Sequence, residues 1–479
     1  MRKIYWYVSS FLSKYYLIIL ISLLSGFLLF SFLIPQLIKF VSQKERRFVA
    51  LIGDYSLENL PSLITNQVSF GLMKASPLNS ELTTSLAKDF TISEDGLTYT
   101  FTLKEDLLWQ DNQPLHPNDI HYNLPEVHTE FTDNQIIYTL PEPFSPFTAR
   151  LTKPLLRFIP TKKLFRLEFF NIIGIGDYAI TDYTHRQHSR SKLSSMTVES
   201  SEKKIIYRFY LTQEQAITAF KKGEVNEIIG LNHPRELEDW PNLTITRENP
   251  QSQYLALFFN LADERFPKNI RQAFGYALTK NTALGLLAFG PINDRSWAFF
   301  KGIKRYDYSL DRAIERLVDE FPAEPLEITL TTNSLNYDRA IRLKDDLEML
   351  GERAREYCLR ENKQYEALTC DNLSITININ VNNFPDLNNF ELLLLSLATG
   401  IDPDQYTFWH SDQPNNFTNY KNTRVDALLE EGRQVQDQQE RTLIYQEFQQ
   451  VLSEDVPAIF LEYDLNYNIS RGQSETVVE

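Results

Sequence analysis

The chain contains few residues that could carry out metal or nucleophilic chemistry. Histidine occurs at His116, His121, His128, His185, His188, His233 and His410. None of them stands in a recognisable nucleophile motif with serine or cysteine, and no pair has the His-x-x-x-His spacing of a helical metal site. Two closer pairs, His116 with His121 and His185 with His188, lie in polar segments that lack supporting carboxylates. We therefore expect no catalytic residue, no metal site and no cofactor.

The two cysteines, Cys358 and Cys370, leave two interpretations open. Their surroundings lack the paired Cys/His spacing of a zinc site. Outside the cytoplasm the two thiols could form a disulfide that closes a small loop, whereas in a reducing compartment both would stay free. The residues alone do not decide between these states.

Ligand binding is the chemistry that the sequence favours, and its residues gather between positions 392 and 422. There an apolar strand leads into a turn rich in Asp, Pro and Asn, and then into aromatic residues. Such a junction is typical of the floor of a ligand cleft. For Asp402, which precedes Pro403, a turn-forming role is favoured over ligand contact. Trp409 lies in a polar loop, and we expect it to form a wall of the cleft rather than to fill a core.

Composition and periodicity predict the elements that must position such a cleft. A chain of 479 residues with 43% hydrophobic and 13% aromatic content can bury several cores, which suggests two or three domains. The net charge of -15 argues against a nucleic-acid partner. Helices are predicted at 213–222, 310–321 and 338–350, and strands at 48–52 and 326–330. This alternation favours an α/β fold.

The N-terminal region contains an uncharged apolar run at residues 15–34, about 20 residues long. A run of this length can cross a hydrocarbon core of ~30 Å as a helix. The small-residue cleavage site of a signal peptide does not follow it, and no cysteine is present there for lipid attachment. We predict a transmembrane anchor at 15–41, preceded by an N-terminal segment at 1–14, and hence a single-pass protein of the cell membrane. Basic residues stand on both sides of the run, so the charges alone leave its orientation open.

A β-hairpin is predicted around Asp95-Gly96, because this dipeptide separates two β-rich runs and is a strong turn signal. The run at 97–103 alternates apolar Leu, Tyr, Phe and Leu with Thr and Lys. That period of two is typical of a strand with one buried face.

The stretch from Leu82 to Asn123 resembles the signature of the extracellular solute-binding proteins of family 5, the oligopeptide, dipeptide and nickel receptors of ABC importers. The matching residues are Leu86-Ala87, Ser93, Asp95 to Phe101, Leu103, Trp109, Asp111, Pro114-Leu115 and Asp119-Ile120. Segments 254–281, 392–422 and 433–463 resemble later parts of the same pattern, in the same order. The resemblance therefore spans most of the chain.

The resemblance implies a two-lobed, periplasmic-binding-protein-like class II α/β fold, with mixed sheets and a hinge, preceded by the transmembrane helix. It also implies the orientation, with the body outside the membrane and a cytoplasmic N-terminus at 1–14. Lobe I is expected at 46–250, with a reduced subdomain at about 66–153, and lobe II at 251–462. The C-terminal segment 463–479 should return to lobe I or be disordered. Residues 351–389 depart from the family length and are expected to form an insertion specific to lobe II.

The resemblance also implies a function. A membrane-anchored substrate-binding protein of an ABC importer would capture peptides in an interlobe cleft, outside the cytoplasmic membrane, and deliver them to a permease. Its partners would be a peptide or small solute, the ABC transporter permease and the membrane, and the protein would be a monomer and not an enzyme. Two alternatives stay open, a ligand-binding sensor or assembly protein without transport and a receptor for a non-peptide solute.

In the family, a strand can pair with the peptide backbone and an Asp holds the peptide amino group. Here Thr399 stands at the place of that Asp, and Ser396 at the place of the usual Trp. A neutral hydroxyl cannot replace the Coulombic attraction of a carboxylate for an ammonium group. Either Asp402 or Asp404 supplies the charge, or the ligand has no amine fixed there. The residues expected to line the peptide cleft are Tyr254, Phe259, Asn260, Ser396, Leu397, Thr399, Asp402, Asp404, Tyr406 and Trp409.

Three of these residues have a structural interpretation of equal weight. Tyr254 and Phe259 could belong to the core rather than the cleft. Asn260, at a predicted strand end, could orient a ligand or brace the turn between the lobes.

Overall fold

The computed structural model describes residues 13–18, 20–22, 24–29, 44–164, 167–187, 189–248, 250–280, 286–361 and 367–472. The predicted N-terminal segment 1–14 and anchor 15–41 therefore lie partly outside the described residues. Among the residues that are described, no helix is long and apolar enough to cross a membrane.

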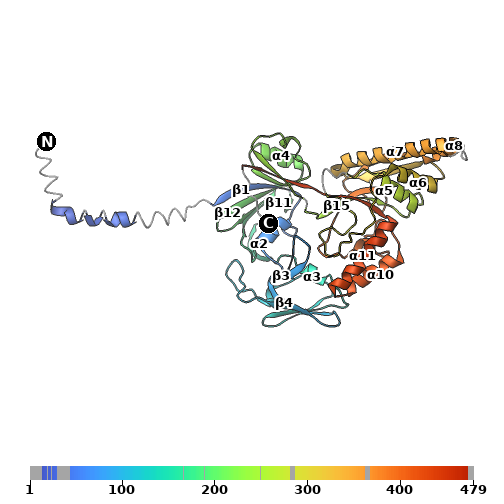
Figure 1. Cartoon of the computed structure of the whole chain (residues 1–479). Coiled ribbons are helices and arrows are strands. Elements are labelled where there is room, and N and C mark those ends of the chain that lie inside the picture. The colour runs from blue at the N-terminus through green and yellow to red at the C-terminus, as the bar shows by residue number, and fades with distance from the viewer. Residues whose placement is uncertain are drawn as a thin grey trace, which may run out of the picture.

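Two large sheets organise the body of the molecule (Figure 1). The first has the strand order β10-β11-β12-β1-β13-β20-β14 and the second the order β17-β16-β18-β15-β19. The strands of the first are β1 (Glu45–Ile52), β10 (Ala179–Arg186), β11 (Ser189–Glu199), β12 (Lys203–Tyr210), β13 (Glu227–Leu231), β14 (Leu243–Glu248) and β20 (Asn466–Arg471). The strands of the second are β15 (Gln253–Phe259), β16 (Leu326–Thr332), β17 (Ile375–Val381), β18 (Leu392–Ala398) and β19 (Ala458–Tyr463). Both sheets are mixed, which confirms the expected α/β class.

Parallel pairing organises the centre of the first sheet, where β1 lies between β12 and β13. Helix α4 (Gln213–Lys221) covers one face and α2 (Ser62–Val68) contributes to the core on the other. The predicted helix is confirmed at α4, which begins where the Thr212 side chain accepts a hydrogen bond from the Gln215 amide and ends before Gly223. Gly223 has φ +75°, a left-handed conformation that suits glycine after a helix.

A smaller four-stranded sheet, with the order β4-β5-β7-β6, contains the predicted hairpin. Its strands are β4 (Ala87–Ile92), β5 (Thr98–Leu103), β6 (His128–Phe131) and β7 (Gln135–Thr139). The alternation is confirmed, because Tyr99, Phe101 and Leu103 are buried while the threonines between them are partly exposed. In the turn, the Asp95 side chain accepts a hydrogen bond from the Leu97 amide, and Gly96 adopts φ +69°. The remaining short elements here are β2 (Met73–Ala75), β3 (Leu82–Thr84), η1 (Pro117–Asp119), α3 (Phe147–Arg150), β8 (Arg157–Leu164) and β9 (Leu167–Ile173).

Helices cover both faces of the second sheet (Figure 1). One core forms against α5 (Lys268–Ala277), α6 (Leu310–Glu320) and α7 (Tyr337–Glu361), and the other against α9 (Tyr406–Trp409), α10 (Thr423–Gln434) and α11 (Gln438–Asp455). The short elements α8 (Ala367–Cys370), η2 (Arg235–Leu237), η3 (Ser334–Asn336) and η4 (Asp371–Leu373) complete the described structure. The predicted helices at 310–321 and 338–350 and the strand at 326–330 are thereby confirmed.

Residues 351–389, expected as an insertion relative to the family, supply regular elements of the second lobe. Helix α7 continues through Gly351 to Glu361, and β17 pairs in parallel with β16 in the register Leu326 to Ile375. Both elements belong to the framework of the second sheet. Gly351 lies inside α7, at a point where the helix approaches β17 closely. A side chain would not fit there, because an added Cβ would meet the Ile375 amide nitrogen at 2.6 Å.

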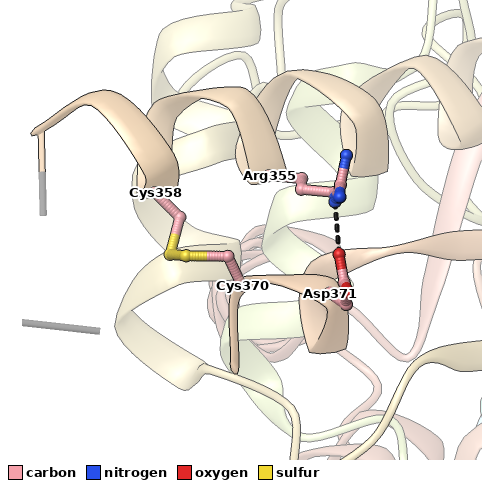
Figure 2. Close-up of a disulfide and its surroundings, with 4 residues drawn as sticks. All are labelled: Arg355, Cys358, Cys370 and Asp371. Carbon is pink, nitrogen blue, oxygen red and sulfur yellow. Dashed lines mark hydrogen bonds and ion pairs between the residues drawn. A yellow bond between two sulfur atoms is a disulfide. The ribbon is translucent and has the colours of Figure 1, made fainter. Parts of the chain in front are cut away.

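The structure decides the state of the two cysteines, which form a disulfide between the end of α7 and α8 (Figure 2). Both side chains are fully buried at the edge of the core under α7. Arg355 and Asp371 form an ion pair next to them (Figure 2).

The chain crosses between the two large sheets twice. It leaves the first sheet after β14 and enters the second at β15, and it returns from β19 to β20. Strand β20 then lies between β13 and β14, so the C-terminal segment returns to the first sheet. Two adjacent connections of this kind are the usual structural basis of a hinge.

Candidate functional site

The two large sheets turn the carboxyl ends of their parallel strands toward each other. In Figure 1, β1 begins on the side of the first sheet that is remote from the second. Helix α7, which follows β16 through η3, begins near the first sheet and runs outward to α8. Ligands of α/β proteins bind beyond the carboxyl ends of such strands. The space between these two edges is therefore where we place the candidate site.

Thr399, at the position of the amine-binding Asp of the family, is bonded to the first crossing. Its hydroxyl donates to the Gln251 carbonyl at 2.6 Å, and its amide donates to the Ser252 carbonyl at 2.8 Å. Both bonds tie the end of β18 to the segment that enters β15. Thr399 thus has a structural role at the junction of the two sheets.

Ser396 is bonded to the second crossing. Its hydroxyl donates to the Asp464 carboxyl at 3.2 Å, while the Asp464 amide donates to the Gln253 carbonyl at 3.1 Å. Burial raises the pKa of Asp464 to about 6, and the nearby charge of Glu462 acts in the same direction, whereas the bond from Ser396 opposes it. Glu462 itself pairs with Arg339 of α7 at 3.3 Å.

Both aspartates that were candidates for an amine anchor are paired within the second lobe. Asp402 accepts two hydrogen bonds from Arg441, at 2.8 and 3.1 Å, in a pair whose side chains are 9% and 7% exposed. Asp404 forms a similar pair with Arg433. Each carboxylate also accepts a backbone amide two residues further on, from Asp404 and Tyr406 respectively. The turn-forming interpretation of Asp402 agrees with this geometry.

The three large apolar candidates lie in the core of the second lobe. Trp409 is 1% exposed and packs with Tyr420 and Phe460, so the expectation of a cleft wall is corrected. Trp409 ends the short helix α9, and its ring belongs to the core that β15, α10 and α11 also form. Tyr254 and Phe259 are also buried, on opposite faces of β15 and roughly 17 Å apart along the strand.

The remaining candidates are structural neighbours of this core. The Asn260 side chain donates to the Phe390 carbonyl at 2.9 Å and accepts from Asn419, so it braces two loops at the end of β15 remote from the crossings. Leu397 is opposite Tyr254 in the sheet and packs against the same core. The Tyr406 ring lies 3.8 Å from the Arg433 guanidinium. Of the predicted set, Ser396 and Thr399 are the two whose side chains form hydrogen bonds to the crossings.

Asp464, Gln251, Glu462 and Arg339 were missed by the sequence reasoning. A signal for Asp464 exists, because it directly follows a buried strand, where polar groups often lie at the edge of a site. Arg339 and Gln251 have no comparable signal, since their partners are distant in sequence. Within the described ranges, no group of three or more His, Cys, Asp and Glu side chains could hold a metal ion.

The raised pKa of Asp464 predicts a specific pH dependence of stability. The unfolded carboxyl has a pKa near 3.8 and the folded one about 6, so the native state favours the protonated form. This contribution is fully present below pH 3.8 and is lost as the pH rises through 6. In the parent, ionisation of Asp464 should therefore lower the free energy of unfolding by roughly 2–3 kcal/mol between pH 3.8 and pH 6 and above. Asp464→Asn should lack this pH-dependent loss. Urea denaturation across this range measures it, and the exposed Asp319→Asn on α6 is the control.

The comparisons agree with this architecture. The family pattern described as bacterial extracellular solute-binding proteins, family 5 Middle, matches residues 81–130. The oligopeptide-binding protein AppA of Bacillus subtilis is 21% identical over 472 residues, covering 86% of this chain and 84% of its own.

Solved structures extend the likeness to the whole body. The ABC transporter substrate-binding protein CtaP of Listeria monocytogenes superposes with a TM-score of 0.69 at 21% identity, covering 90% of this chain and 94% of its own. NikZ of Campylobacter jejuni, in complex with Ni(L-His), gives a TM-score of 0.66 at 20% identity, covering 89% and 94%. These likenesses support the class II fold. The pattern matched at residues 81–130, the similarity to AppA and the shared fold all indicate a likeness to the bacterial extracellular solute-binding proteins of family 5.

Proposed function

We propose that this protein is the membrane-tethered receptor of an ABC importer and that it binds a peptide-like solute between its two lobes. The observation that carries the proposal is the opposition of two carboxyl strand edges across a pair of crossings (Figure 1). Closing such edges on a solute needs rotation only about the crossings. The ligand drives closure because it contacts both edges only in the closed form.

The chemistry of the two edges supports a ligand with apolar side chains. Leu211, after β12, is 54% exposed, and Leu335 and Phe384, after β16 and β17, are 64% and 90% exposed. The loops that carry the latter two are joined, since the Ser334 amide donates to the Asn383 side chain at 2.9 Å. Leu335 and Phe384 thus expose apolar side chains on two joined loops at one edge, which supports contact with an apolar part of the ligand there. Peptide backbones bound by hydrogen bonds, with side chains on apolar walls, fit such edges.

The ligand amine is not expected to be held by a carboxylate at the family position. Thr399 is neutral, and Asp402 and Asp404 are both committed to arginines. We therefore propose capture through the backbone and side chains, with blocked and free amino termini accepted equally.

The location that we propose is outside the cytoplasmic membrane. The apolar run at 15–34 would be the anchor, and its described residues expose large apolar side chains such as Leu17, Ile18 and Phe27. The Cys358–Cys370 disulfide also fits an oxidising compartment. An anchor would keep the receptor near its permease. Delivery to a permease is tested by asking whether a permease co-purifies with the full chain.

A thermal-shift screen of the full chain in detergent tests ligand binding. Mixed peptides of two to ten residues, with free or acetylated amino ends, are compared with Ni²⁺ plus L-histidine. A one-site ligand at 100 times its Kd adds about 2.7 kcal/mol, enough for a visible rise in Tm. We expect equal shifts with both peptide pools. Leu335→Asp/Phe384→Asp should abolish them, whereas Leu443→Asp, at an equally exposed site on α11, should not.

Other outcomes would change the proposal. A shift with Ni²⁺ and L-histidine alone would replace the peptide by a metal chelate, the solute present in the NikZ complex. A shift with free-amine peptides alone would require a carboxylate anchor. The absence of any shift, with no permease co-purified, would favour a sensor or assembly role.

A further inference from the structure

Both crossings between the sheets are held from one place, the end of β18. Thr399 bonds the first crossing at Gln251 and Ser252, and Ser396 bonds the second at Asp464. We call Ser396, Thr399, Gln251 and Asp464 the hinge latch. A rotation of the lobes changes the backbone of both crossings, so it acts on these bonds directly.

The first crossing contains an unusual backbone conformation. Gln251 has φ +52°, in the left-handed region that residues with a side chain rarely adopt, and it is 2% exposed. Such a conformation persists only where the surroundings hold it. The bond from the Thr399 hydroxyl to the Gln251 carbonyl, 2.6 Å long, is one of these constraints. Releasing it would favour a different conformation of the crossing.

The second crossing contains a titratable group with little compensation for its charge. Among the described residues, the Asp464 side chain receives one hydrogen bond, from Ser396, while its backbone amide is bonded to Gln253. The charged groups near it are Glu462, two residues earlier in the chain, and Arg339, which is paired with Glu462. An ionised Asp464 would face a second carboxylate without a cation of its own, so it would gain from hydration.

We propose that the hinge latch is a pH-sensitive device, in which protonated Asp464 stabilises the described arrangement of the lobes and ionised Asp464 favours a rotated arrangement in which its carboxylate is hydrated. Burial raises the pKa of Asp464 to about 6, which places the transition in a range that extracytoplasmic surfaces experience. The proposal concerns the protein without ligand and does not depend on the solute.

The experiment measures the distance between the lobes as a function of pH. Leu211→Cys and Leu335→Cys place one spin label on each exposed carboxyl edge, and the native cysteines are occupied in the disulfide. Distance distributions of the full chain in detergent are recorded by double electron–electron resonance between pH 5 and pH 8. The same pair of labels is carried by Asp464→Asn, Ser396→Ala, Thr399→Val and Thr399→Ser. Asp319→Asn serves as the control for an exposed carboxyl group.

We expect the distribution of the parent and of Asp319→Asn to change with pH, with a midpoint near pH 6. Asp464→Asn should keep the low-pH distribution throughout, with less than a fifth of the parent's change. Thr399→Val should populate the rotated arrangement at pH 5 as well as at pH 8. Thr399→Ser should restore the pH-dependent distance distribution of the parent. A pH-independent distribution in the parent would overturn the proposal, and so would an unchanged response in Asp464→Asn. If Thr399→Val fails to fold, Ser396→Ala tests the latch at the other crossing.

Discussion

Arg441→Met is expected to lower the free energy of unfolding by about 3–5 kcal/mol, the usual loss when one partner of a buried ion pair is removed. The reason is the remaining carboxylate, because Asp402 would stay buried without the two hydrogen bonds that Arg441 donates to it. Arg441 also donates to the Gly432 carbonyl at 3.0 Å, but this carbonyl accepts from Ser145 and Tyr445 as well, so the main loss is at Asp402. Methionine keeps much of the apolar volume and limits the effect to charge and hydrogen bonding.

Two further variants make this expectation specific. Arg424→Met breaks a pair with Glu447 whose side chains are 54% and 45% exposed, so it should cost less than about 1 kcal/mol. Arg441→Met/Asp402→Asn should cost clearly less than the sum of its single changes, because the buried charge is removed along with its partner. Guanidinium denaturation of all variants gives these values. A loss below 1 kcal/mol for Arg441→Met would mean that Asp402 reaches solvent and is available to a ligand.

The elements predicted from the sequence are those whose signal is local. The hairpin at Asp95-Gly96 and the helix α4 are specified by turn chemistry and by apolar periodicity within a few residues. The alternation of Ile with Thr and Asn marks β17 as a strand, but no local signal places it at the edge of the second sheet. The helix predicted at 338–350 continues past Gly351, whose missing side chain allows α7 to pack closely on β17. Glycine can end a helix or permit close packing, and only the tertiary contact distinguishes the two.

The candidate site depended more strongly on partners distant in sequence. Asp402 and Arg441 are 39 positions apart, and Thr399 and Gln251 are 148 apart. A single sequence shows a carboxylate or a hydroxyl but not the group that it meets. For this reason the residues near the crossings could be predicted as a region, through the junction of an apolar strand and a polar loop, while their roles could not.

The disulfide carries the second large expected effect. Cys358→Ala/Cys370→Ala should lower the free energy of unfolding by about 3 kcal/mol, because the bond between positions 12 apart restricts the unfolded chain. Either single substitution should cost about as much as the pair, since one change already abolishes the bond. Urea denaturation with and without dithiothreitol measures the difference, and reduction of the parent should reproduce the loss.

The neighbouring ion pair supplies a matched control for the disulfide. Arg355→Met removes the contact with Asp371 beside the same two elements (Figure 2), but these side chains are 47% and 44% exposed. Its cost should therefore stay below about 1 kcal/mol. A loss confined to the cysteine variants would assign the stabilisation to the covalent bond rather than to local packing. Equal stability of the reduced and oxidised parent would contradict it, and would also remove one of the two observations that support an oxidising location.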